Sequence, residues 1–438
     1  MIVPDVARGM ALLGIALANV CTGWITTTHP DGQYFGGIDS GNVWDKATVL
    51  FTAMFAHNRG LPMFSTLLGF GIGLITLSLW RRGFPLGQAR MVIIKRYGFL
   101  ALFGIIHLVF IFNGDIMFFY GCCALVISMF ITLHDKTLKK IAYALLTIIT
   151  VLGIGAFVFT LLVPELGMNY VLFSELPKSY GKLVLDGLVM LLGQAVAAVP
   201  FMLMYGPIML VGFTWARQGT LADVASHRTE LRIWAGIAAA IILGVGLPWG
   251  LAAIGVLPAE AEGAFYLLNT FVGVITGPGI LAMLALVLEK VQTLPWWLWP
   301  FSALGKHSMS GYIMQSIIFF AVVFPFTLNI GSQFYASGLA LLAVGNWLLT
   351  LLLACLLEYF GKPGPFEWLH RRISYGKTMR PELKKSSCLA ALNHPSAALQ
   401  CINQKEMAKH AASGLGGAQQ AAIAQRVEGQ GACEGQPL

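Results

Sequence analysis

A histidine and an aspartate close together along the chain are the residues best suited to move a proton. His107 comes six residues before Asn113, and the turn Asn113-Gly114-Asp115 interrupts the apolar sequence around it. An imidazole exchanges protons near neutral pH, and a carboxylate at a helix N-terminus is stabilised by the helix dipole. Two interpretations stay open. In one, His107 joins two helices and Asp115 caps one; in the other, both face a cavity together with Tyr120.

A second histidine, His57, lies two residues before Arg59. A neighbouring positive charge favours the neutral imidazole, which is the form that accepts a proton. Together with His29 and His107, His57 is one of three histidines expected at or near the outer half of the protein. We expect His57 at the rim of a central cavity, as the first choice for a general base. The alternative is a solvated loop histidine.

The first apolar segment carries an arginine and an asparagine on one helix face. Arg8 and Asn19 are 11 residues apart, which places them within ~20° of one direction and about 16 Å apart along a helix. This face would have a cation at the membrane surface and an amide near its far end. In the simpler interpretation Arg8 pairs with Asp5, and Asn19 hydrogen-bonds to a neighbouring helix.

The composition of the whole chain is that of a membrane protein. Of its 438 residues, 57% are hydrophobic and 11% charged, and the mean hydropathy is +0.74. About 20 apolar residues in a helix cross a bilayer core about 30 Å thick. We therefore predict an all-α polytopic transmembrane bundle of about ten helices, at approximately residues 9–25, 61–80, 97–113, 115–133, 140–164, 198–216, 233–254, 265–288, 307–328 and 337–359.

The basic residues of the loops fall on one side of this predicted bundle. With the N-terminus inside, Arg8, the inner loops and the segment 360–385 after the last span hold 21 of the 28 Lys and Arg residues, and the outer loops hold four. This bias predicts that both termini are cytoplasmic. The formal net charge of +8 is then mostly attraction to an anionic inner leaflet. Because the charges are spread over several loops, we expect the lipid bilayer as a partner and no nucleic acid.

Two longer outer segments interrupt the pattern of spans. The segment 26–60 is polar and then amphipathic at Trp44–Phe55, which we expect to lie along the outer interface. The segment 165–197 is too polar for a span and too apolar for a free loop. We expect it to form an interfacial or re-entrant helix.

The domain organisation follows from shifts in composition. Residues 1–376 form the predicted membrane domain, and residues 377–438 a cytoplasmic tail rich in Ala, Gln, Gly and Ser, which we expect to be disordered. The first apolar run has no fitting small-residue cleavage site, so we expect an uncleaved helix. The seven cysteines show no CxxC or Cys/His ligand spacing, which predicts neither a disulfide framework nor a metal site.

The segment after the last span has polar residues of its own. Prolines at 363 and 365 end the last helix, and Glu367 and Arg371 have the i,i+4 spacing of a pair on one helix face. Such a helix anchors the chain at the inner surface. In the alternative interpretation Arg371 and Arg372 approach the phosphates of a cytoplasmic cofactor.

Five motifs in order resemble those of the YeiB-type bacterial inner-membrane proteins. They are Asp5-Val6-Ala7-Arg8-Gly9, Phe64-Ser65-Thr66-Leu67-Leu68-Gly69-Phe70-Gly71 after Arg59, His107 with Gly114-Asp115-Ile116 and Tyr120, the stretch 305–316, and the C-terminal signature at 364–376. The chain departs from the family pattern at Leu68 (commonly Phe), at Ser310-Gly311 (usually Thr-Asn) and at His370 (usually Trp). The resemblance implies a multi-pass protein of the bacterial inner membrane.

The resemblance also implies a fold related to transmembrane acyltransferases of the heparan-glucosaminide N-acetyltransferase type. Those enzymes move an acyl group from cytoplasmic acyl-CoA to an acceptor, a small molecule or glycan, on the far side. Arg8 and Arg371 would then meet the CoA phosphates. The related O-acyltransferases have a His where Asn19 stands, and an amide cannot act as a general base. The base would therefore be His57 or His107, the latter with Asp115.

A transporter of a small solute is the other function class that the sequence leaves open. Its path would be lined by His107, Asp115 and Gln315. No inverted repeat with paired broken helices is evident in the sequence, which argues against this class. In either class the further polar candidates for a cavity are Asn19, Arg59, Tyr120, Tyr312, Gln315 and Glu367.

Overall fold

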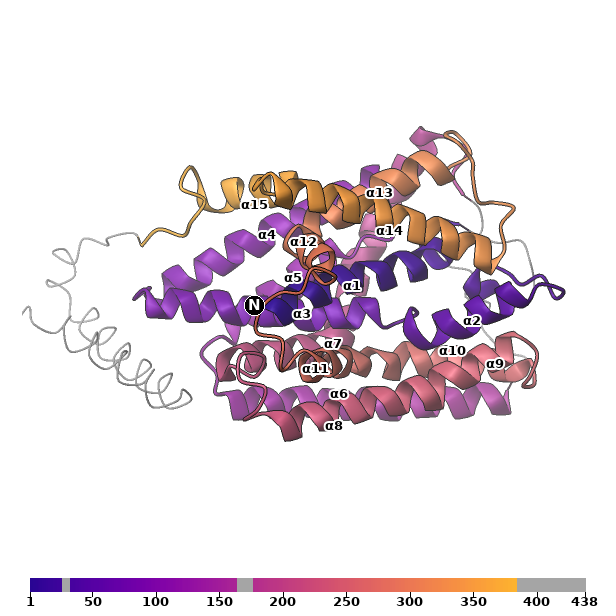
Figure 1. Ribbon diagram of the computed structural model, residues 1–438, viewed down its shortest axis with the longest axis horizontal. Helices are drawn as coiled ribbons and strands as arrows, with labels where there is room; N and C mark the ends of the chain where they lie inside the picture. The colour runs from indigo at the N-terminus through magenta and orange to yellow at the C-terminus, as the bar shows by residue number, and fades with distance from the viewer. Residues whose placement is uncertain (26–31, 164–175, 384–438) are drawn as a thin grey trace, which may run out of the picture.

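The computed structural model describes residues 1–25, 32–163 and 176–383. Within these ranges every regular element is a helix, and most helices run along the long axis of the molecule (Figure 1). The predicted all-α class is confirmed. Eight segments are long and apolar enough to cross a membrane: Ile2–Trp24, Val43–Arg81, Leu86–Phe110, Asp135–Leu162, Tyr180–Gln218, Arg228–Ala253, Glu260–Val287 and Ala336–Tyr359.

Two shorter apolar helices fall where the other two predicted spans lie. They are α5 (Met117–Met129) and α13 (Ser308–Val323). At 1.5 Å per residue, 13 and 16 residues reach about 20 and 24 Å, less than the hydrocarbon core. The fold is thus a polytopic bundle with eight candidate spans. Ten crossings with both termini inside stay a prediction.

Three of the long segments are interrupted midway. These are α2 (Val43–Phe55) with α3 (Gly60–Arg81), then α8 (Arg228–Ile241) with a π turn at Ile242–Gly246 and α9 (Leu247–Ala253), and α10 (Glu260–Val272) with a 3-10 turn at Gly273–Ile275 and α11 (Thr276–Val287). At the first break Asn58 has φ = 59°, a left-handed conformation that asparagine tolerates better than most residues.

The stretch expected along the outer interface forms α2, the first helix of the candidate span Val43–Arg81, and its place at the interface stays a prediction. α2 packs against α9 and α14 (Ala336–Tyr359). Its Asp45 side chain is buried, and the carboxylate accepts hydrogen bonds from the backbone N–H groups of Asp39 and Ser337. These bonds fix the polar start of α2 to the start of α14. The amphipathic pattern therefore marks a face packed on protein.

The segment expected to be a separate interfacial or re-entrant helix is part of a longer one. α7 is a single helix, Tyr180–Gln218, of 39 residues, about 58 Å long at 1.5 Å per residue. Its polar residues find partners within or beside the helix: Lys182 pairs with Asp186, and Gln194 Nε2 donates to Asn113 O at 3.4 Å. These partners let the helix continue through polar sequence. The part of the prediction at 165–175 lies outside the described residues.

α1 (Ile2–Asn19) runs through the middle of the bundle and lies against α3, α14 and α12 (Trp299–Lys306) (Figure 1). A Cβ added at Gly9 would lie 2.2 Å from Phe301 O, and one at Gly305 would lie 1.7 Å from Asp5 O. The backbones of α1 and α12 therefore touch, as small residues permit in membrane bundles. This contact places the start of α1 beside the end of α12.

The last described helix follows the final candidate span. α15 (Pro365–Tyr375) begins with Pro365, which is favoured in the first helical turn, and packs on α4 (Leu86–Phe110) and α13. The predicted membrane domain ends at 376, directly after this helix. Most of the predicted tail, residues 384–438, lies outside the described residues, so its disorder stays a prediction.

Candidate functional site

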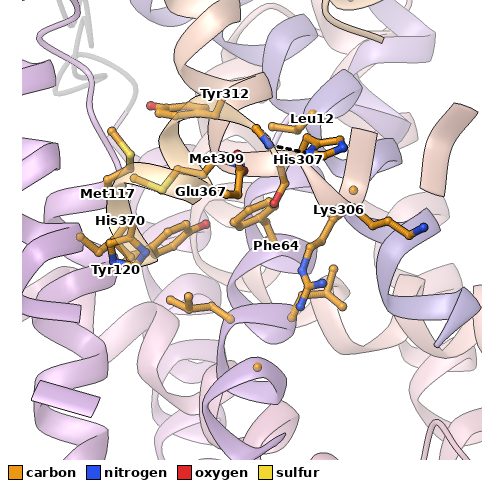
Figure 2. Close-up of a pocket in the computed structure, with 18 of the residues that line it drawn as sticks. Leu12, Phe64, Met117, Tyr120, Lys306, His307, Met309, Tyr312, Glu367 and His370 are labelled. Atoms are coloured by element: carbon orange, nitrogen blue, oxygen red, sulfur yellow. Dashed lines mark hydrogen bonds between the residues drawn. The ribbon is translucent and has the colours of Figure 1, made fainter. Parts of the chain in front are cut away.

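A cavity of about 490 Å³ opens where α1, α4, α12 and α15 meet (Figure 2). Four basic side chains from these four helices line it: Arg8, Arg96, Lys306 and Arg371. All four were assigned to the inner side by the loop charges. Sequence analysis had selected only Arg8 and Arg371 from this set as ligand-binding candidates. Together the four make a site suited to a polyanion, such as a phosphorylated ligand.

The acidic residues at the cavity are engaged with the protein. Arg8 Nη1 donates to Asp5 Oδ1 at 3.1 Å, so the predicted surface pair is present. Glu367, expected to pair with Arg371, accepts instead from the backbone N–H groups of Met309 (2.8 Å) and Ser310 (3.0 Å). Its carboxylate therefore caps the N-terminus of α13, where the helix dipole favours a negative charge. The Arg371 side chain remains at the cavity, whereas Arg372 is not among the lining residues.

Two histidines support the wall of this cavity. His307 Nδ1 accepts the Gly364 N–H at 3.0 Å (Figure 2), and His370 Nε2–H donates to Arg96 O at 2.7 Å. Burial, with help from the charges of Arg96 and Arg371, lowers the pKa of His370 to about 4. His370 is thus neutral at pH 7 and ties α15 to α4. Sequence analysis noted it only as a departure from a motif.

We expect stability to fall as the pH drops from about 6.5 to about 4, and His370→Gln to reduce this fall. Below about pH 6.5, the unfolded-state pKa, the imidazole is protonated in the unfolded chain but stays neutral in the folded protein. This difference stabilises the unfolded state, so the folding stability falls until the pH reaches the folded-state pKa. The full effect is about 3 kcal/mol. Thermal unfolding midpoints at pH 7 and 4.5 measure it, with the exposed His134→Gln as the control. An unchanged pH dependence in His370→Gln contradicts the prediction.

The apolar part of the cavity leads from the basic residues to two tyrosines. Leu12, Phe64 and Met117 line it together with Tyr120 and Tyr312 (Figure 2). Ser65 Oγ donates to the Tyr120 hydroxyl at 3.1 Å, and this hydroxyl donates to Leu61 O at 3.2 Å. The cavity is therefore amphipathic, basic at one end and mostly apolar beyond.

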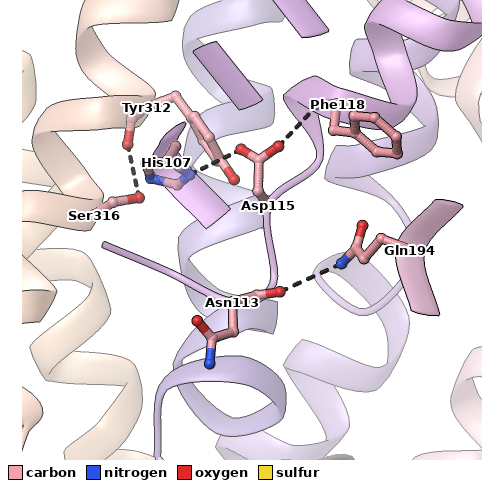
Figure 3. A network of polar contacts seen from close by, with 7 residues as sticks. All are labelled: His107, Asn113, Asp115, Phe118, Gln194, Tyr312 and Ser316. Carbon is pink, nitrogen blue, oxygen red and sulfur yellow. Dashed lines mark hydrogen bonds and ion pairs between the residues drawn. The ribbon is translucent and has the colours of Figure 1, made fainter. Parts of the chain in front are cut away.

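Directly behind Tyr312 lies the histidine–aspartate pair that the sequence singled out. His107 Nδ1–H donates to Asp115 Oδ1 at 2.8 Å, and the His107 ring centroid is 5.3 Å from that of Tyr312 (Figure 3). Asp115 Oδ2 accepts the Phe118 N–H at 2.8 Å, so the predicted capping role is also present. His107 Nε2 is buried and has no hydrogen-bond partner among the described residues. The pair is arranged as in a general base held by a carboxylate.

His57 lies elsewhere and does not line this cavity. Its side chain is 5% exposed and is enclosed by Phe35 (ring centroids 4.9 Å apart) and Trp249 (5.4 Å). Cys21 Sγ is 3.8 Å from its Nε2. His57 is therefore neither a solvated loop histidine nor a residue at the rim of this cavity. The third histidine of the expected set, His29, falls outside the described residues.

The remaining polar candidates are divided between the site and the helix contacts. Asn19 ends α1, half-buried, and is not among the lining residues although Arg8 on the same helix is. Gln315 Nε2 donates to Leu12 O at 3.5 Å, and Asn346 Nδ2 donates to Gln315 O at 2.9 Å. These amides join α13 to α1 and α14. In the described part of the chain no three His, Cys, Asp or Glu residues are grouped to hold a metal ion.

The fold and its eight candidate spans define the class of multi-pass α-helical membrane proteins. Residues 215–377 match the model of the family described as "Protein of unknown function (DUF418)". The chain is 24% identical over 413 residues to the uncharacterised protein YxaH of Bacillus subtilis (strain 168), covering 87% of this chain and 96% of that protein. It is 24% identical over 417 residues to the uncharacterised protein YeiB of Escherichia coli (strain K12), covering 87% and 98%. The expected resemblance is therefore confirmed as distant similarity over most of the chain.

Proposed function

We propose that this protein is a bacterial inner-membrane acyltransferase that moves an acyl group from cytoplasmic acyl-CoA to an acceptor from the outer side. The observation that carries the proposal is the order of groups along one cavity. Basic residues and Tyr312 line it, and the His107–Asp115 pair, which is not among the lining residues, lies directly behind Tyr312.

The donor is assigned to the basic end. Arg8, Arg96, Lys306 and Arg371 offer guanidinium and ammonium groups to the CoA phosphates, and arginine forks suit phosphate oxygens. The cavity volume of about 490 Å³ is in the range of small-molecule sites. The cavity holds one part of a CoA molecule, and the rest of the CoA extends to the inner surface. The apolar stretch past Phe64 and Met117 receives the thioester arm.

The chemistry is assigned to His107. Asp115 holds the imidazole with its proton on Nδ1, which leaves the Nε2 lone pair free to accept a proton. The acceptor's hydroxyl or amine gives its proton to Nε2 and bonds to the thioester carbonyl carbon. The carbon–sulfur bond then breaks, and the leaving thiolate takes the proton back from the imidazolium. Neither histidine lines the cavity, but His107 contacts the lining residue Tyr312 whereas His57 does not, and this favours His107 as the base that replaces the histidine missing at Asn19.

Transport of a small solute is the second candidate function. The observation that favours it is the set of three interrupted segments, because substrate and ion sites in transporters are commonly built from discontinuous helices. Gln315, expected to line such a path, is instead bonded to α1.

The test is release of free CoA by the purified full chain in nanodiscs, given acetyl-CoA and membrane-derived acceptors. We expect saturable release, and a KM for acetyl-CoA that rises ~10-fold or more when Arg371→Gln removes one charge–phosphate contact. Arg372→Gln, on the same helix but away from the cavity, is the matched control and should behave as wild type. Absence of wild-type turnover together with saturable solute uptake in vesicles would replace this proposal with transport.

A further inference from the structure

We infer that Arg59 is the centre of a second site, a buried site for a single monovalent anion of halide size. The Arg59 side chain is 1% exposed. Its Nε donates to Met54 O at 3.0 Å and its Nη1 to Asn58 O at 3.0 Å, whereas Nη2 is buried without a hydrogen-bond partner in the described chain. No described carboxylate forms an ion pair with it.

The guanidinium lies deep in the bundle. A Cβ at the next residue, Gly60, would lie 2.7 Å from Ala11 O and 2.8 Å from Ile15 N. These atoms belong to the middle of α1, so Arg59 is far from the ends of the candidate span Ile2–Trp24. A charge at such depth is costly and normally marks a function. A buried cation without a counter-charge costs several kcal/mol, and a bound anion offsets this cost.

The three helix breaks meet at this side chain. Arg59 itself stands at the α2–α3 break. A Cβ at Gly246, in the π turn, would lie 3.1 Å from Arg59 Nη2, and one at Gly273, in the 3-10 turn, would lie 2.8 Å from Nη1. π turns and discontinuous helices inside membrane bundles recur at functional and ion-binding sites. Here the lack of a side chain at both glycines lets the backbone of the two turns approach the guanidinium closely.

Two asparagines complete the surroundings. The position that a Cβ would occupy at Gly273 is also 2.9 Å from Asn269 Oδ1 and 3.0 Å from Asn58 Nδ2. Asn58 is held by Tyr205, whose hydroxyl donates to Asn58 Oδ1 at 3.1 Å, and it donates from Nδ2 to Asn269 O at 2.8 Å.

Asn269 Oδ1 has no hydrogen-bond partner among the described residues. Anion binding turns this amide so that Nδ2 replaces Oδ1. The turn gives up only the 3.4 Å bond from Nδ2 to His57 O.

The occupant is limited in size by the same contacts. Arg59 is enclosed by α2, the two turns and α10, and it does not line the cavity of the proposed acyl donor. These close contacts exclude a nucleotide or a sugar phosphate, whereas a chloride-sized ion needs only a donor such as the unpartnered Nη2. The site is thus independent of the acyl-CoA proposal.

The test is the thermal unfolding midpoint of the purified full chain as sodium chloride or bromide replaces sodium gluconate at constant ionic strength. We expect a saturable rise in the wild type, no rise in Arg59→Gln, and an unchanged rise in the control Lys46→Gln on α2. If Arg59→Gln does not fold, Gly273→Ala serves instead. Its methyl carbon would lie 2.8 Å from Nη1, so it should displace the guanidinium and raise the half-saturating bromide concentration ~10-fold or more.

A structure determined in bromide supplies the direct measurement, because bromide is located by its anomalous scattering. We expect an anomalous peak within hydrogen-bonding distance of Arg59 Nη2. The inference is overturned if the thermal unfolding midpoint of the wild type does not change with the anion, or if the midpoint of Arg59→Gln rises by the same amount. A bromide structure without that peak overturns it as well.

Discussion

Replacing His107 with alanine should lower acyl transfer by a factor of ~10²–10⁴, the usual contribution of a positioned general base. The variant removes the imidazole that Asp115 holds beside Tyr312, and with it the proposed acceptor of the proton. The loss should appear in kcat, with the KM for acyl-CoA nearly unchanged, because the basic residues that bind the donor lie at the other end of the cavity. Initial rates of CoA release over a range of acetyl-CoA concentrations measure both constants.

Two companion variants separate catalysis from folding. His57→Ala removes an imidazole that is buried among aromatic rings away from the cavity, so its turnover per folded molecule should match the wild type. Asp115→Asn retains a carbonyl oxygen for the Phe118 N–H but no longer holds the His107 proton on Nδ1. It should lower kcat and alter the pH profile. Equal losses in His107→Ala and His57→Ala would reject the assignment.

Gly212→Ala should destabilise the bundle by about 1–3 kcal/mol, the usual cost of overpacking. α7 and α3 touch backbone to backbone at this point: a Cβ at Gly212 would lie 1.9 Å from Thr66 O, and one at Gly69 would lie 1.9 Å from Met209 O. A methyl group at 212 therefore has to push the two helices apart. Gly69 lies in the stretch 64–71, and this contact gives that glycine a physical reason.

The control for this prediction lies on the same helix. A Cβ at the exposed Gly193 would meet nothing within 4 Å, so Gly193→Ala should leave stability unchanged or raise it slightly, since alanine favours the helix. Thermal midpoints of the purified variants in one detergent provide the comparison. Equal midpoints for Gly193→Ala and Gly212→Ala would contradict the packing argument.

Features that depend on local sequence pattern could be predicted. Runs of about 20 apolar residues predict spans because the requirement comes from bilayer thickness. The turn at Asn113-Gly114-Asp115 placed Asp115 at a helix N-terminus, and its carboxylate does accept the Phe118 N–H. The pairing of Arg8 with Asp5 was predictable for the same reason, because the two residues are three apart on one helix.

Features that depend on long-range contacts could not be predicted. Arg96 and Lys306 looked like ordinary inner-loop cations, since nothing in one sequence brings α4 and α12 to the same cavity. The breaks at Ile242–Gly246 and Gly273–Ile275 lie in apolar sequence with no interruption in hydropathy. The enclosure of His57 depends on Trp249, which is distant along the chain.

The place of α15 in the fold has a consequence for biogenesis. This helix follows the final candidate span, yet it supplies Arg371 to the cavity and, through Glu367, caps α13. The proposed donor site therefore stays incomplete until residues 365–375 have left the ribosome, after the last candidate span has been synthesised.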